Sequence, residues 1–122
     1  MSKKQLRWAL AAYIAGIFIL SALPGNTLPN HLFPQWDKLV HFVEYFILGY
    51  LVVQNVKTVN PSMFVLLIIA GIGISGLDET WQSFQPGRDS SFLDMLADGF
   101  GYICGSLFAL KWSAHSLLKE HG

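Results

Sequence analysis

Ionisable side chains stand at helical spacing inside otherwise apolar stretches of this sequence. One helical face would carry Asp37, His41, Glu44 and Tyr45, with Lys38 beside them. Imidazole titrates near neutral pH, and neighbouring carboxylates can exchange protons with it. This set therefore has the chemistry of a general acid–base site, in which His41 is the candidate base.

Two later stretches bring further acids to the same side of the predicted bundle. The first, near the end of its helix, contains Ser75, Asp78, Glu79 and Gln82, and the second, near the start of its helix, contains Asp94 and Asp98, one turn apart. Ionisable groups in a membrane must face one another or a wet cavity rather than lipid. We therefore expect a single polar pocket, with His41, Glu44 and Asp78 as candidate catalytic residues. The candidate ligand-binding residues are Asp37, Lys38, His41, Glu44, Tyr45, Asp78, Glu79, Gln82, Arg88, Asp94 and Asp98.

Several of these residues have a structural reading as well as a functional one. His41 and Asp98 could serve as hydrogen-bonding groups between helices, and Asp94 could cap a helix N-terminus, where the helix dipole favours acids. Arg88, on a Pro-Gly turn, could hold a phosphate or carboxylate through its planar fork, or pair with a loop acid. The donor set also suits divalent cations, but there is no HExxH or similar motif. The sequence therefore assigns no metal and no cofactor.

The composition indicates that these groups are positioned by membrane helices. The chain has 122 residues, of which 52% are apolar and 13% charged. Mean hydropathy is +0.43. Zero formal net charge gives no reason to expect nucleic-acid binding, and the single cysteine excludes an intrachain disulfide or CxxC site. A polar surface large enough to cover a soluble domain is missing, so a membrane protein is favoured.

Four apolar stretches, separated by Pro- and Gly-containing connections, predict transmembrane helices at about 7–23, 37–56, 62–81 and 91–112. The predicted fold is an all-α integral membrane bundle of four helices in one domain, 1–122. The cations Lys3, Lys4, Arg7, Lys57, Lys111 and Lys119 flank one side of this arrangement. The positive-inside rule then places both termini in the cytoplasm and the acids at the outer side. Because Ser21-Ala22-Leu23 is a poor cleavage site, we expect the first helix to be retained.

Small residues recur every four positions along the last predicted helix. The stripe consists of Ala97, Gly101, Gly105 and Ala109. Such small-xxx-small patterns let helix backbones approach closely in a bilayer. We expect the stripe to pack inside the bundle, although the same pattern occurs in homodimer interfaces, so a homo-oligomer remains an alternative.

The polar motifs read Asp37-Lys38-Leu-Val-His41-Phe-Val-Glu44-Tyr45, Asp78-Glu79-Thr-Trp-Gln82 and Pro86-Gly-Arg88-Asp89-Ser-Ser-Phe-Leu-Asp94, followed by Asp98, Gly101 and Gly105. Together they resemble the VanZ-like family of bacterial membrane proteins. This sequence departs from the family at Asp98, where the family commonly has asparagine. The resemblance implies a role in the bacterial cell envelope, since the family is named for a protein associated with teicoplanin resistance. It implies no established reaction.

Three functions fit these observations. The first is a multi-pass protein of the bacterial cytoplasmic (inner) membrane whose outer-side pocket binds an anionic or lipid-linked group, such as a wall precursor or a glycopeptide. The second is an intramembrane hydrolase or transferase, with His41 and Glu44 or Asp78 as base and Arg88 as anion stabiliser. The third is a structural or partner-binding protein. A proton-coupled transporter is a lesser possibility, because four helices without inverted repeats make a poor pathway.

Overall fold

The computed structural model describes residues 2–23, 36–56, 58–86 and 92–121; for 36, 37 and 114–121 it describes the backbone alone. This part of the chain contains helices and no strands, so the predicted all-α fold is confirmed for it. The helices are α1 (Lys3–Ser21), α2 (Trp36–Gln54), α3 (Pro61–Ser83) and α4 (Phe92–His121).

Local capping explains where two of the helices begin. Ser2 and Gln5 form a capping box, so α1 begins four residues before the predicted start at 7 and includes its polar first turn. At α3, the Asn60 side chain accepts a hydrogen bond of 2.8 Å from the Met63 amide, and Pro61 occupies the first turn, where no amide donor is needed. The fourth helix, α4, continues past the predicted end at 112 to His121, so its last turns are helical although they contain polar residues.

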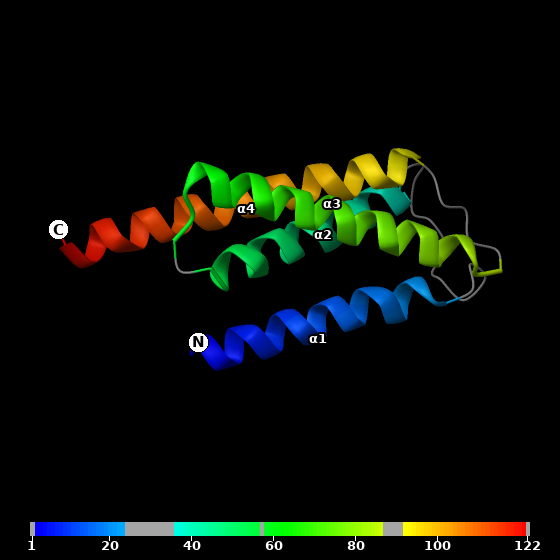
Figure 1. Ribbon diagram of the computed structural model, residues 1–122, viewed down its shortest axis with the longest axis horizontal. Helices are drawn as coiled ribbons and strands as arrows, with labels where there is room; N and C mark the ends of the chain where they lie inside the picture. The colour runs from blue at the N-terminus through cyan, green and yellow to red at the C-terminus, as the bar shows by residue number, and fades with distance from the viewer. Residues whose placement is uncertain (1, 24–35, 57, 87–91, 122) are drawn as a thin grey trace.

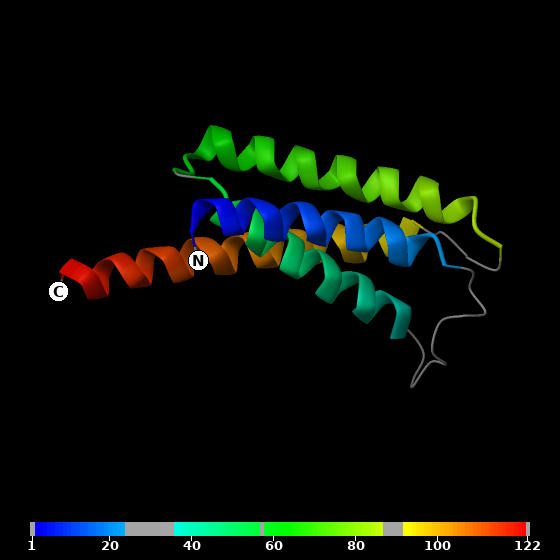
Figure 2. The same ribbon diagram turned by 90° about the horizontal axis from the view of Figure 1, so that it is seen from below.

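The helices run alternately up and down the bundle. Figures 1 and 2 show the N- and C-termini at one end, together with the end of α2 and the start of α3. We call this the terminal end. The opposite end, here the distal end, holds the end of α1, the start of α2, the end of α3 and the start of α4. The polar motif residues of α2, α3 and α4 are thereby brought to one end of the bundle.

The most extensive contact in the bundle is between α2 and α4, and it depends on glycine. A Cβ atom added at Gly101 or Gly105 would lie under 3.0 Å from the backbone carbonyl oxygen of Phe42 or Phe46. A Cβ at Gly49 would meet the carbonyl oxygen of Tyr102 in the same way. The predicted internal packing of the small-residue stripe is confirmed at Gly101 and Gly105, which face α2 of the same chain.

Tyrosine side chains hold the other helices to this pair. The Tyr102 hydroxyl donates to the Leu67 carbonyl at 2.6 Å, and its ring fills the space beside Gly71, so α4 is joined to α3. The Tyr13 hydroxyl donates to the Glu44 carbonyl at 2.6 Å and joins α1 to α2. Each of these hydroxyls satisfies a helix carbonyl's second acceptor site without breaking the helix.

The exterior of the bundle is apolar, whereas much of its interior is polar. The exposed large side chains on α3 and α4 include Val65, Leu66, Ile69, Ile72, Leu96, Phe100 and Leu107. Two helical segments of the described chain, Pro61–Ser83 and Phe92–Ser113, are long and apolar enough to cross a membrane. An apolar surface around buried acids is the arrangement that a lipid environment favours.

Candidate functional site

Buried polar side chains from all four helices meet at the distal end. We call this group the distal cluster; it consists of Ser21, Lys38, His41, Tyr45, Ser75, Asp78, Glu79, Gln82, Asp94 and Asp98. Asp78 and Asp98 are fully buried, at 0% exposure. Since buried charges are expensive unless they are paired and hydrogen-bonded, the partners of each acid decide what the cluster can do.

His41 and Asp98 form the central pair of the cluster. Nδ1 of His41 lies 2.7 Å from Oδ1 of Asp98, and the Ser75 hydroxyl donates to Oδ2 of Asp98 at 2.9 Å. An ionised Asp98 accepts hydrogen bonds at both of its oxygens, so it favours the tautomer in which His41 donates from Nδ1. Nε2 is then the nitrogen that can accept a proton, and it lies 3.9 Å from Oδ2 of Asp94, beyond hydrogen-bond distance.

A second group of hydrogen bonds surrounds Asp78. The Ser21 hydroxyl donates to Oδ1, and the Tyr45 hydroxyl donates to Oδ2 at 2.9 Å. Gln82 adds a bond from Nε2 to the Ser21 hydroxyl oxygen at 3.1 Å. These bonds join α1 and α2 to α3 through one buried carboxylate. Asp78 therefore acts as the tie between helices, whereas Asp98 holds the histidine.

The remaining acids differ in how well they are paired. Nζ of Lys38 lies 3.1 Å from Oδ1 of Asp94, so these two form an ion pair at the edge of the cluster. Glu79 is 5% exposed, and neither of its carboxylate oxygens has a hydrogen-bond partner among the described residues. Nδ1 of His41, which carries a charge only when the imidazole is protonated, lies 3.7 Å from Oε1. Glu79 is the acid of the cluster whose charge is least compensated.

The structure brings together most of the residues that the sequence analysis proposes for one pocket. They are Lys38, His41, Tyr45, Asp78, Glu79, Gln82, Asp94 and Asp98. Glu44 is half-buried, and its backbone carbonyl accepts a hydrogen bond from the Tyr13 hydroxyl. The side chain of Asp37 and the whole of Arg88 lie outside the described residues.

Two serines of the cluster have a larger part than the sequence indicates. Ser21 comes from α1, a helix for which no pocket residue is predicted. The sequence signal that could have identified Ser21 is a polar residue at the end of a long apolar stretch. Ser75 shares a helical face with Asp78, but its bond to Asp98 depends on the rotation of α4. Because Ser75 donates to Asp98 and not to His41, these three residues do not form a serine–histidine–aspartate triad.

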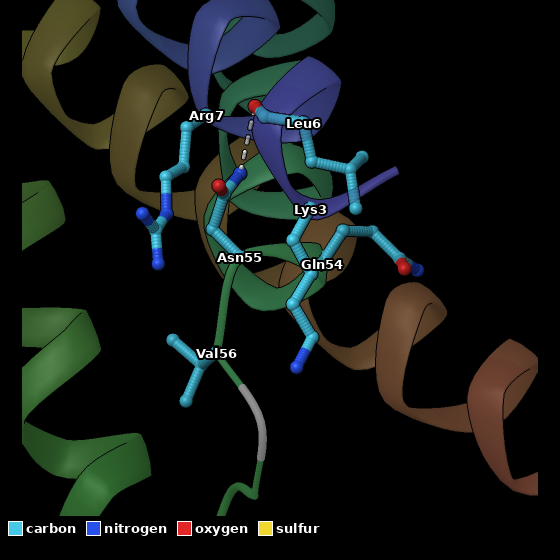
Figure 3. A pocket seen from close by; sticks show the side chains of 6 residues that line it. All are labelled: Lys3, Leu6, Arg7, Gln54, Asn55 and Val56. Atoms are coloured by element: carbon cyan, nitrogen blue, oxygen red, sulfur yellow. Dashed lines mark hydrogen bonds between the residues drawn. The ribbon is translucent and has the colours of Figure 1, made fainter. Parts of the chain in front are cut away.

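A cavity lies at the other end of the bundle and has a different character. It encloses about 270 Å³ at the terminal end, and Figure 3 shows its lining: Lys3, Leu6, Arg7, Gln54, Asn55 and Val56. Nδ2 of Asn55 donates to the carbonyls of Leu6, at 3.1 Å, and Leu51, at 2.8 Å. Among the described residues, the lining contains cations and amides but no acid or histidine. The buried acids and His41 lie instead in the distal cluster.

The chain matches a known protein family. The family model described as VanZ/LLP1 matches residues 4–114, which include the distal cluster and the glycine contacts between α2 and α4. No curated protein and no solved structure matches the chain.

Proposed function

The chain belongs to the VanZ/LLP1 family, and we propose that it is a multi-pass protein of the bacterial cytoplasmic (inner) membrane whose distal cluster binds an envelope molecule. All four helices span the membrane in this proposal, with both termini in the cytoplasm. It is supported by the apolar exterior, by the position of both termini at one end and by the cations Lys3 and Arg7 there. The distal cluster then lies at the outer side, at the depth of lipid headgroups.

Reporter fusions are expected to show this topology. Green fluorescent protein fused after Gly122 should fluoresce, and alkaline phosphatase at the same place should be inactive, because the C-terminus is cytoplasmic in the proposal. Phosphatase fused after Asn30 should be active outside. Enzyme activity and fluorescence in whole cells give the measurement. An active phosphatase after Gly122 would contradict the proposal.

The binding role rests on one observation, the concentration of buried ionisable groups in the distal cluster. Burying an ionisable side chain is costly unless it is paired and hydrogen-bonded, and Glu79 is not hydrogen-bonded among the described residues. A hydrogen bond between membrane helices returns about 0.6 kcal/mol on average. Stabilising the bundle is therefore a poor reason to bury His41 with four carboxylates. A ligand at the cluster is the better reason.

The ligand that we propose is an anionic or lipid-linked group, such as a cell-wall precursor or a glycopeptide. Lys38 stands at the edge of the cluster with its side chain 28% exposed, where it can meet an anionic headgroup. Arg88, on the connection to α4, would add a planar fork for phosphate or carboxylate. Binding of such a molecule connects the protein to teicoplanin resistance.

Teicoplanin susceptibility tests this role. In cells that depend on the protein for resistance, His41→Ala and Arg88→Ala should lower the inhibitory concentration to that of cells without the protein. Thr80→Ala is the control, because Thr80 is exposed and its side-chain hydroxyl donates to the Gly76 carbonyl of its own helix. Membrane levels and thermal stability of each variant are measured in parallel. Stable variants with unchanged resistance would refute the role.

A second function is favoured by the His41–Asp98 pair. An acid that fixes the histidine tautomer and leaves Nε2 to take a proton is the usual arrangement of a general base. We propose as the alternative an intramembrane hydrolase or transferase that activates water or a substrate hydroxyl at this nitrogen. His41→Gln should then abolish turnover of a lipid-linked substrate while ligand binding persists.

A further inference from the structure

Three side chains of the distal cluster have the geometry of a metal-binding group. His41 of α2, Glu79 of α3 and Asp98 of α4 each offer one ligand atom, and these atoms lie within 4.8 Å of one another. All three residues are buried. We propose that they bind a divalent transition-metal ion, zinc in the first place. One imidazole nitrogen and two carboxylate oxygens at about 2.0–2.2 Å are donors that zinc accepts.

The unpaired carboxylate of Glu79 points independently to a ligand. Glu79 is 95% buried, and both of its oxygens lack a hydrogen-bond partner among the described residues. Its Oε1 faces Nδ1 of His41 at 3.7 Å, a separation that suits two ligands of one ion better than a hydrogen bond. A buried acceptor pair without donors is costly, and a cation between the three side chains removes that cost.

The charges of the cluster lead to the same conclusion. Four buried carboxylates, those of Asp78, Glu79, Asp94 and Asp98, face two groups that can be cationic, Lys38 and His41. Even with His41 protonated, the described part of the cluster keeps an excess of two negative charges. A divalent ion supplies two positive charges at the place where Glu79 is uncompensated. The ion would replace the proton between Nδ1 of His41 and Asp98: the neutral imidazole would carry its proton on Nε2, any second proton would pass to solvent, and Nδ1 would be free to act as a ligand.

Three protein ligands leave a position open on a four-coordinate ion. An oxygen of a phosphate or carboxylate can fill it, which explains how a pocket rich in acids can hold an anionic group. This last step rests on the proposed function, but metal binding itself does not. If the protein binds zinc but has no effect on teicoplanin resistance, the proposed metal site stands and the proposed envelope role is wrong.

Metal binding is measured on the full chain, purified in detergent, stripped with a chelator and titrated with Zn²⁺ alone or with Co²⁺ as a spectroscopic substitute. We expect one ion per chain, with a Co²⁺ absorption band in the visible range. Glu79→Gln and His41→Gln each remove one ligand. Changing a residue that only hydrogen-bonds to a metal ligand typically lowers the affinity about 10–100-fold, and we expect each of these two variants to lower the Zn²⁺ affinity by more than that. Glu44→Gln is the matched control, because Glu44 is an acid of α2 outside the three-residue group.

The thermal stability of each variant shows whether lost binding reflects a lost fold. A folded Glu79→Gln protein that no longer binds Zn²⁺, beside a Glu44→Gln protein that binds normally, is the expected result. Either of two results would overturn the proposal: a wild-type chain that binds no Zn²⁺ or Co²⁺, or a Glu79→Gln chain that binds them as tightly as wild type. In the first case the excess negative charge is neutralised by protons.

Discussion

Gly105→Ala is expected to separate α2 from α4 and to remove most of the folded protein. The added Cβ would lie under 3.0 Å from the Phe46 carbonyl oxygen, and helix backbone cannot yield as a flexible side chain can. Overpacking of a closely packed site costs typically about 1–3 kcal/mol and occasionally more. Because the clash is with backbone, we expect the upper part of this range. Thermal unfolding in detergent and the amount of protein in the membrane measure the effect.

Gly99→Ala is the matched control for this prediction. Gly99 lies on the same helix, and a Cβ there has nothing within 4 Å. Alanine is a better helix former than glycine by up to about 1 kcal/mol, so Gly99→Ala should be as stable as wild type or more stable. Equal behaviour of the two variants would show that α2 and α4 are not in backbone contact at Gly105.

Asp78→Ala is expected to loosen α1 and lower the stability of the whole bundle. The change removes both acceptors of the Ser21 and Tyr45 hydroxyls and leaves a cavity where they meet. Each buried donor left without a partner costs about 1–3 kcal/mol. The unfolding temperature in detergent should fall, and proteolysis should cut the chain before α2 sooner than in wild type. An unchanged unfolding temperature would contradict the tie between helices that we assign to Asp78.

Two further variants separate lost hydrogen bonds from lost charge. Asp78→Asn keeps the size of the side chain and one acceptor oxygen, so it should lie between wild type and Asp78→Ala. In a double-mutant cycle, Ser21→Ala should cost clearly less in the Asp78→Ala background than alone, because the two side chains share a bond. Additive costs would show that Ser21 and Asp78 act independently.

The helices could be predicted closely from the sequence because their limits have local causes. Long apolar stretches and Pro- and Gly-containing connections depend on neighbouring residues, and so do the caps at Ser2 and Asn60. The differences lie at polar helix ends: α1 begins at Lys3, and α4 continues to His121. At these positions hydropathy falls while the helix persists, so a pattern of apolar residues underestimates its length.

The composition of the site was easier to predict than its pairing. Helical spacing alone places His41 and Tyr45 on one face of α2, and Asp78 and Gln82 on one face of α3. It does not give the rotation of one helix against another, which decides that His41 meets Asp98 and Tyr45 meets Asp78. For His41 and Asp98, that rotation follows from the glycine contacts of α2 with α4, which are tertiary and specific to the folded chain.

The separation of these partners along the chain has a consequence for biosynthesis. His41 and Asp98 are 57 residues apart, and so are Ser21 and Asp78. During translation, α1 and α2 leave the ribosome with polar groups whose acceptors have not yet been made. The bundle can close only when α4 emerges and its glycines reach α2. A message truncated before α4 would therefore yield a product that exposes unsatisfied groups to lipid and is a substrate for membrane quality-control proteases.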